Sequence, residues 1–354
     1  MSKLKKSKVL LAVGGTGGHL FPAQALARDL KDVDLLFAGS GLSKNRYFLK
    51  NSFPYKEVAS GTFLTSNFRR NVKGIFSLLK GFRESFKLLN EFQPDLIVGF
   101  GSFHVFPLLL AARFKKTPLI LFAADTIPGK VIRFFSKKAL VSALQFEEAG
   151  QHLKGKTTLV KMPFWSTGGT ISKKEAREYY SLDPELLTLL IFGGSQGAAA
   201  LNEAASKISL KVPFQVLHFV GHEKNCEAVQ ENYQKRGIRA CVKAFEEKMH
   251  YAWSAADLAI CRAGASTLAE MLVYEVPAIL IPYPYAADDH QKVNAEIFEK
   301  KIGGALMLLE TELSSEKLSS LLDELPLSLM KEKLAAFKQK EKKQDLSTLI
   351  NSYL

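Results

Sequence analysis

Two glycine-rich segments, each between an apolar run and a helical pattern, are the first candidates for chemistry. Gly14–His19 follows the run Lys8–Val13, and Gly193–Gly197 follows Leu187–Phe192. Glycines let a backbone approach a ligand closely, and the amides at a helix start favour an anion. Neither segment has the spacing of a Walker loop or of a dinucleotide-binding fingerprint. A phosphate cradle is therefore one interpretation of each segment, and a tight strand-to-helix turn is the other.

His19 ends the first glycine segment, at the expected carboxyl end of a strand. An imidazole titrates near neutral pH, so it can accept a proton from a hydroxyl nucleophile or hydrogen-bond a phosphate. We therefore treat His19 as a candidate catalytic residue, with a structural histidine as the alternative.

A third segment, Cys261–Glu270, also follows an apolar run and continues into a helix. Its small residues would leave room for a ligand at the helix start, and Glu270 could accept hydrogen bonds from both hydroxyls of a ribose. The alternative for Glu270 is a carboxylate that complements the helix dipole. Further along, the amides of Gln291 and Asn294 could bind sugar hydroxyls, although a solvated helix face would also carry them.

Other catalytic signatures are missing from the sequence, which has no HExxH, no GxSxG and no zinc-spaced cysteine cluster. Asp32-Val33-Asp34 has the D-x-D spacing of some divalent-metal sites. It falls at an expected helix-to-strand turn, at the opposite end of the sheet from the first glycine segment, so we interpret it as a solvated turn. The three cysteines form no CxxC pair, which favours a reducing compartment.

Strands that alternate with helices must position these residues. Helices are expected over Pro22–Leu30, from Val72 and from Ala198. The other strands are expected at Asp34–Ala38, Asp95–Gly99, Leu119–Ala123, Ala139–Val141, Gln215–Val220, Arg239–Lys243, Asp257–Cys261 and Ala278–Ile281. This alternation predicts parallel sheets with right-handed crossovers, an α/β class with two Rossmann-like domains.

The join between the domains is expected at the turn formers of Lys161–Thr170. We predict a first domain over residues 1–161, a second over 162–330, and a lysine-rich helical tail over 331–354 that packs back on the first domain. The sheets are expected to face an interdomain cleft, a favoured place for a ligand.

Most of the positive charge lies in the first half of the chain. Residues 1–160 hold 25 Lys or Arg against 10 Asp or Glu, whereas the whole chain has a net charge of +13. Cations interleave with aromatic and aliphatic residues over residues 63–87, which suits anionic lipid head groups. We expect the loop over residues 63–73 to meet a membrane and the apolar residues after Ile75 to face the core. No nucleic-acid module is recognised, and neither a secretion signal nor a membrane span is predicted.

These segments, together with Gly99–Phe103 and Asp289–Asn294, resemble in their order the MurG family of bacterial cell-wall glycosyltransferases over most of the chain. The resemblance implies the two-domain GT-B fold. It also implies inverting transfer of N-acetylglucosamine from UDP-N-acetylglucosamine to the muramoyl C4 hydroxyl of undecaprenyl-linked lipid I, which makes lipid II. The resemblance further implies that no cofactor is required, with a divalent metal left open as the alternative, and that the protein is peripheral at the cytoplasmic face of the plasma membrane.

The resemblance also assigns roles to individual residues. The donor would lie in the second domain, with the diphosphate near Ser195 and Gln196, uracil near the backbone of Glu246, and the sugar at Gln291 and Asn294. The ribose would meet the helix start formed by Ala265, Ser266, Thr267, Leu268, Ala269 and Glu270. In the first domain, Thr16, Gly17 and Gly18 would line the cleft, with His19 as base or acceptor-orienting group.

Two stretches depart from the family pattern. Phe122–Asp125 stands where the family has His-Glu-Gln-Asn, so Asp125 replaces an amide in the substrate site, and Met162–Trp165 stands where it has Asn-Pro-Val-Arg. These departures leave two alternatives: a non-catalytic relative that binds UDP-sugar or lipid, and a related glycosyltransferase with another lipid acceptor.

Overall fold

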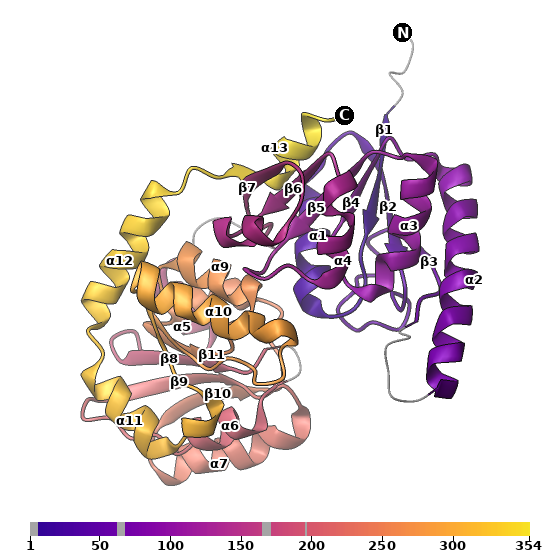
Figure 1. Ribbon diagram of the computed structural model, residues 1–354. Coiled ribbons are helices and arrows are strands. Elements are labelled where there is room, and N and C mark those ends of the chain that lie inside the picture. Colours follow the sequence, from indigo (N-terminus) through magenta and orange to yellow (C-terminus); the bar gives the residue numbers. More distant parts are fainter. Residues whose placement is uncertain (1–5, 62–67, 165–170, 195–196) are drawn as a thin grey trace. The chain divides into compact units, whose positions relative to one another are not determined.

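A computed structural model describes residues 6–61, 68–164, 171–194 and 197–354, with the backbone alone for residues 68–70. The chain divides into two compact units, residues 1–165 with 342–354 and residues 166–341 (Figure 1). Each unit is built on a parallel sheet, so the predicted α/β class is confirmed.

The first unit holds an eight-stranded sheet in the order β14-β7-β6-β5-β4-β1-β2-β3. β1 pairs in parallel with both β2 and β4, with Leu11 opposite Phe37 and Val98. The inner strands are buried apolar runs because helices cover the sheet. The strands are β1 (Ser7–Ala12), β2 (Val33–Gly39), β3 (Tyr55–Glu57), β4 (Leu96–Gly99), β5 (Leu119–Ala123), β6 (Val141–Leu144), β7 (Thr157–Lys161) and β14 (Gln344–Asp345).

Helices α2 and α3 of this unit pack on each other, and α1 packs on α13 (Figure 1). The helices are α1 (Gly17–Asp29), α2 (Phe68–Phe92), α3 (Phe106–Lys115), α4 (Lys130–Phe135) and α13 (Leu346–Asn351), with short helical turns η1 (Phe103–Val105), η2 (Ser136–Lys138) and η3 (Glu147–His152). The prediction that the first helix starts at Pro22 is wrong, because Gly17 and Gly18 already have helical backbone and Pro22 lies inside the helix.

The second unit holds a six-stranded sheet in the order β10-β9-β8-β11-β12-β13. Its strands are β8 (Leu187–Phe192), β9 (Phe214–Phe219), β10 (Arg239–Lys243), β11 (Leu258–Cys261), β12 (Ala278–Leu280) and β13 (Ala305–Met307). Its helices are α5 (Lys173–Tyr179), α6 (Ala199–Ala205), α7 (Cys226–Lys235), α8 (Met249–Ala255), α9 (Ala265–Tyr274), α10 (His290–Glu296), α11 (Ser315–Glu324) and α12 (Leu327–Lys340). Shorter turns are η4 (Glu223–Asn225), η5 (Ala287–Asp289), η6 (Ile297–Ile302) and η7 (Glu310–Glu312).

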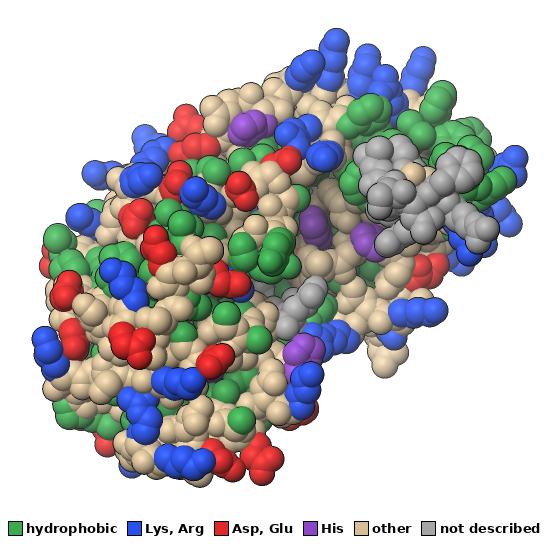
Figure 2. Space-filling model, turned by 60° about the horizontal axis from the view of Figure 1, so that its bottom comes forward, with side chains coloured by type: hydrophobic (Ala, Val, Ile, Leu, Met, Phe, Trp, Pro, Cys, Tyr) green, Lys and Arg blue, Asp and Glu red, His purple; other side chains and the backbone are tan. Residues whose placement is uncertain are grey.

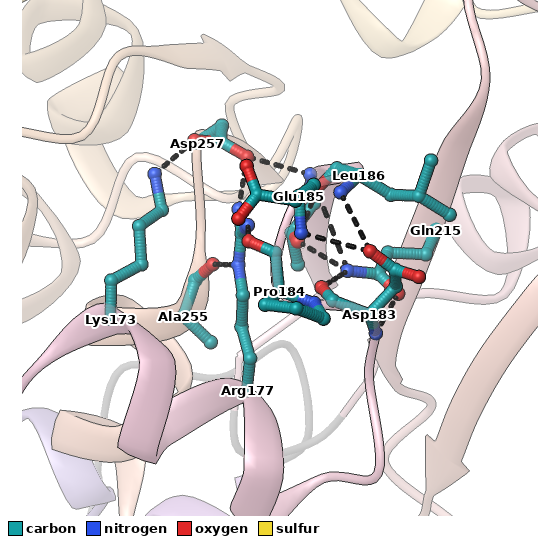
Figure 3. Close-up of polar contacts among 10 residues, drawn as sticks. Lys173, Arg177, Asp183, Pro184, Glu185, Leu186, Gln215, Ala255 and Asp257 are labelled. Atoms are coloured by element: carbon teal, nitrogen blue, oxygen red, sulfur yellow. Dashed lines mark hydrogen bonds and ion pairs between the residues drawn. The ribbon is translucent and has the colours of Figure 1, made fainter.

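A polar network at the amino edge of the second sheet fixes α5 (Figure 3). Asp257 accepts hydrogen bonds from Arg177 at 2.6 Å and from the Thr188 amide at 2.7 Å, and it pairs with Lys173. Arg177 is buried and also donates to the carbonyls of Ala255 and Pro184. The network therefore joins α5, α8 and two central strands.

The apolar residues of α2 are distributed differently from the prediction. Phe76 and Leu79 are 68% and 55% exposed and Phe86 is exposed too, so the predicted core-facing position is wrong for these three residues. It is confirmed for Leu88 and Leu89, which are buried in the core with Phe82 packed against it. The helix also lies very close to the loop after β3, because a β-carbon at Gly81 would lie only 1.7 Å from the Ala59 carbonyl oxygen. Within the described residues, no helix is long and apolar enough to span a bilayer.

The tail divides between the units. α12 packs on α9 within the second unit, and Lys338 there binds the carbonyl of Val273 and the carboxylate of Glu275 at 2.7 Å each. Residues 342–354 belong to the first unit, where β14 extends the sheet beside β7.

Candidate active site

Each sheet has a point at which successive strands depart in opposite directions. In the first sheet it lies between β1 and β4, and in the second between β8 and β11. Parallel sheets bind ligands outside the carboxyl ends of the strands at such a switch point. The glycine segment at residues 14–18 follows β1, that at 193–197 follows β8, and the helix start at Ala265 follows β11. The fold thus places these three sequence candidates at the two switch points.

The first switch point carries the start of α1. Thr16 directly precedes the helix, and its side chain makes no capping hydrogen bond to the amides of Gly17 and Gly18. Such amides can bind an anion. His19 lies in the first helical turn rather than in the loop, and it is half-buried.

His19 lies against the loop that follows β4. A β-carbon at Gly101 would be 3.9 Å from Nε2 of His19 and 3.1 Å from Cγ1 of Ile132. Gly101 has a φ of +85°, which favours glycine, and the absent side chain leaves room for the imidazole. The loops after β1 and β4 are therefore in direct contact.

Sequence reasoning missed His104, which lies in that second loop. A β-carbon at Gly14 would lie only 2.6 Å from the Cβ of His104, so the histidine lies directly over the first glycine segment. Its Nδ1 is 3.1 Å from the carbonyl oxygen of Ser40. The signal was available, because His104 comes soon after a strand and a Gly-Phe-Gly turn, much as His19 follows β1 and its glycines.

The departures from the family pattern fall partly in the core. Phe122 and Ala123 are buried at the end of β5, where the Phe122 ring packs on Phe100 with centroids 5.6 Å apart. Asp125 follows at the carboxyl edge of the same sheet and is half-buried. Met162 is buried, whereas Trp165 lies outside the described residues.

In the second unit, the glycines after β8 are required by the turn. A β-carbon at Gly193 would lie 2.4 Å from the Ala198 nitrogen, and one at Gly197 would lie 2.6 Å from the Val220 carbonyl oxygen. Only Gly194 of these three faces open space, with a φ of +82°. Ser195 and Gln196, the predicted diphosphate contacts, lie outside the described residues.

The start of α9 is built for close approach. Gly264 precedes the helix and has no side chain that could cap it. Within the helix, Ala265, Leu268 and Ala269 are buried. The predicted contacts Ser266 and Thr267 are half-exposed in the first turn. The partial positive charge at a helix start of this kind favours an anion.

Glu270 lies one turn further along α9, where Trp253 Nε1 donates to its Oε2 over 3.1 Å. Trp253 is buried, and its ring is parallel to that of Tyr274. Burial raises the pKa of Glu270 to about 7, although the indole bond lowers it. The carboxyl can therefore exchange a proton near neutral pH.

Glu246, in the loop after β10, is buried and bound within its own segment. Its carboxylate accepts hydrogen bonds from Lys243 Nζ and from the Lys248 amide, each at 2.8 Å. Burial opposes ionisation, but these hydrogen bonds outweigh it and hold the pKa of Glu246 below its usual value. Because the side chain is engaged, a ligand would meet the backbone of this loop.

The two candidate sugar-binding amides brace neighbouring loops. Gln291 Oε1 accepts from the Tyr283 amide at 3.0 Å, and the buried Asn294 donates to the Ala263 carbonyl at 3.0 Å. Arg262, which sequence reasoning did not single out, donates to the carbonyls of Ile281 and Pro282 at 3.2 Å. The loops after β11 and β12 are thus fixed to each other.

Comparisons with known proteins match both halves of the chain. The glycosyltransferase family 28 N-terminal domain matches residues 9–143, and the C-terminal domain of that family matches residues 188–350. A curated relative from Protochlamydia amoebophila is 37% identical over 356 residues, or 97% of this chain and 95% of the relative. It is named UDP-N-acetylglucosamine--N-acetylmuramyl-(pentapeptide) pyrophosphoryl-undecaprenol N-acetylglucosamine transferase.

A relative of the same name from Chlamydia pneumoniae is also 37% identical, over 96% of each chain. Among solved structures, MurG of Acinetobacter baumannii is similar with a TM-score of 0.75 and 27% identity, covering 98% of both chains. The predicted GT-B fold is confirmed by this likeness and by the two parallel sheets.

Proposed function

The chain belongs to glycosyltransferase family 28, and from that membership we propose that it transfers N-acetylglucosamine from UDP-N-acetylglucosamine to the muramoyl C4 hydroxyl of lipid I. The product is lipid II, with inversion at the anomeric carbon. The observation that carries the proposal is full-length similarity to relatives named for this reaction, in a chain whose candidate residues gather at both switch points.

The donor is assigned to the second unit. The amides at the start of α9 and the segment with Ser195 and Gln196 hold the diphosphate, Glu270 accepts hydrogen bonds from the ribose, and the loop of Glu246 meets uracil. Gln291 and Asn294 face the sugar. As the bond to the diphosphate breaks, negative charge grows on the leaving oxygen, and fixed amides at a helix start stabilise it without reorganising.

The acceptor is assigned to the first unit, at Thr16, Gly17, Gly18, His19 and Asp125. His19 is the base or the group that orients the acceptor. Hydrogen bonds from helix-start amides of α1 suit the acceptor's own diphosphate. An inverting transfer needs one displacement, in which the acceptor oxygen attacks the anomeric carbon and UDP leaves.

A membrane surface is the proposed third partner, because the acceptor is a lipid. Figure 2 shows hydrophobic and basic side chains side by side on the surface of the molecule. We define the α2 face as Ile75, Phe76, Leu79, Phe86 and Phe114, all exposed. Lys73, Lys80, Arg83, Lys87 and Lys115 lie along the same two helices. Such a face suits peripheral binding to anionic lipid, in line with a place at the cytoplasmic side of the membrane.

The test is transfer by the purified full-length chain, given UDP-N-acetylglucosamine and a soluble lipid I analogue. We expect UDP release that depends on the acceptor and a product heavier by one N-acetylglucosamine, with the inverted linkage in its NMR spectrum.

The position of Phe122 and Ala123 in the core favours a second candidate, transfer to a different lipid acceptor. Turnover with another polyprenyl-diphosphate sugar, and none with lipid I, would support it. Donor binding without turnover on any acceptor would contradict both.

A further inference from the structure

His104 and Ser40 hold each other through two hydrogen bonds. The Ser40 amide donates to the His104 carbonyl at 3.1 Å, and His104 Nδ1 lies 3.1 Å from the Ser40 carbonyl oxygen. Ser40 follows β2, and His104 lies in the loop after β4. Because β1 lies between those strands, the pair spans the carboxyl end of β1 at the switch point.

The bond to Ser40 fixes which nitrogen of His104 carries the proton. A carbonyl oxygen can only accept, so Nδ1 must be the donor. In the neutral ring Nε2 then keeps its lone pair. Among the residues that the structure describes, none bonds this Nε2, and the ring is only half-buried. The arrangement is that of a base oriented by a second group.

The surrounding loops are shaped to seat this ring. A β-carbon at Gly15 would lie 3.2 Å from His104 Cδ2 and 3.7 Å from Nε2, so the imidazole covers the glycine backbone. The same loop is fixed from elsewhere by Asn45 Nδ2, which donates to the Gly15 carbonyl at 2.6 Å. Because Gly14 and Gly15 have no side chains, the imidazole of His104 fits directly against their backbone.

Backbone strain lies next to His104. Ser102 has a φ of +74° and a ψ of 149°, a region that residues other than glycine rarely occupy. Its Oγ accepts a hydrogen bond from the His104 amide at 3.4 Å and begins η1. Ser60 Oγ also donates to the Phe103 carbonyl at 2.6 Å. Strain of this kind persists where surrounding contacts hold a functional group in place.

We propose that His104 is the catalytic base of the transfer, an inference that rests on the proposed function. Nε2 takes the proton of the acceptor C4 hydroxyl as that oxygen forms its bond to the anomeric carbon. The bond from the anomeric carbon to the diphosphate oxygen breaks, and its electron pair leaves with UDP. The imidazolium then releases its proton to solvent. His19, which lies against Gly101 of the same loop, orients the acceptor.

The test uses two substitutions at His104 that distinguish the hydrogen bond donated by Nδ1 from the basicity of Nε2. His104→Asn can keep a donor toward the Ser40 carbonyl but has no basic nitrogen, and His104→Ala removes both. Transfer is measured with saturating lipid I analogue, and UDP-N-acetylglucosamine binding is measured by calorimetry. His152→Asn is the matched control, because His152 is exposed in the turn η3 of the same unit.

We expect both His104 variants to lose about 10²- to 10⁴-fold in kcat with donor affinity unchanged, and added imidazole to restore part of the His104→Ala rate. A His104→Asn enzyme within about threefold of wild type would overturn the assignment, since it would leave only a structural role. Equal loss in both variants without imidazole rescue and with lower thermal stability would overturn it as well. Wild-type protein that does not turn over would instead reject the proposed function.

Discussion

The indole Nε1 of Trp253 donates a hydrogen bond to Oε2 of Glu270 over 3.1 Å and so joins α8 to α9. Burial raises the pKa of this carboxyl to about 7. A ribose diol has two protons to donate, and an ionised carboxylate accepts them better than a carboxylic acid. With Glu270 on the ribose, as proposed, donor binding is linked to the loss of one proton.

We expect the affinity for UDP-N-acetylglucosamine to rise by up to about tenfold between pH 6 and pH 8, because the competent ionised fraction rises by that factor. Calorimetry at both pH values measures it. Glu270→Gln cannot ionise, so its affinity should stay flat over this range and fall below wild type at pH 8. Parallel pH curves for the two proteins would reject the role of Glu270.

A buried histidine predicts the acid sensitivity of the second unit. His218 is fully buried, with its ring nitrogens 3.0 Å from Tyr233 Oη and 3.1 Å from Asn202 Oδ1. Burial lowers its pKa to about 3. The unfolded chain takes up this proton near pH 6.5, so the stabilisation is complete above that pH and is lost as pH falls toward 3.

The contribution of His218 should therefore have a slope of up to about 1.4 kcal/mol per pH unit between pH 6 and pH 4. Urea unfolding of wild type and of His218→Gln at several pH values tests it. The variant should be less stable than wild type at pH 7, but the difference between their free energies of unfolding should become smaller as the pH falls. A constant gap over that range would contradict the prediction.

The α2 face predicts how the protein meets lipid. Phe76→Ser with Leu79→Ser should weaken binding to vesicles that contain anionic lipid by about 10²-fold, because each buried side chain contributes about 1.5 kcal/mol or more. Vesicle co-sedimentation measures the change. Val212→Ser is the control, since Val212 is 53% exposed, close to Leu79, but lies in the second unit. Equal binding by all variants would mean that this face does not touch the membrane.

The network around Asp257 predicts a stability effect without a direct effect on the site. Asp257→Asn leaves the buried Arg177 without its anion, and we expect about 3 kcal/mol lower stability of the second unit. Glu203→Gln removes only an exposed partner of Lys207, so the free energy of unfolding should hardly change. Denaturant unfolding compares the two, and similar losses would show that Arg177 is satisfied by its carbonyl partners alone.

The fold could be predicted from the sequence where apolar runs are long and bounded by glycine. The strands at Leu187–Phe192 and Leu119–Ala123 were predicted with the bounds observed for β8 and β5. The strand expected at Ala139–Val141 is instead β6 at Val141–Leu144. The inner strand β7 and the short edge strands β3, β13 and β14 were not predicted. Edge strands of two or three residues carry too little periodicity to be recognised.

For the candidate site, the sequence indicates the loops but not the contacts between them. The glycine segments and the start of α9 were located because they follow buried strands. The importance of His104 depends on Gly14 and Ser40, which the fold brings together from three separate loops. The close approach of Gly81 to Ala59 likewise joins segments that are far apart in the sequence. Contacts between distant segments leave no periodic trace in the sequence.

The pairing of β14 with β7 has a consequence for dissecting the protein. Residues 342–354 return to the first unit, where Leu346, Leu349 and Ile350 of α13 are buried. An expressed fragment that stops near residue 161 would expose the edge of β7 and the apolar surface that α13 covers. We expect such a fragment to aggregate. A soluble amino-terminal half therefore requires the last thirteen residues as a separate peptide or as a grafted extension.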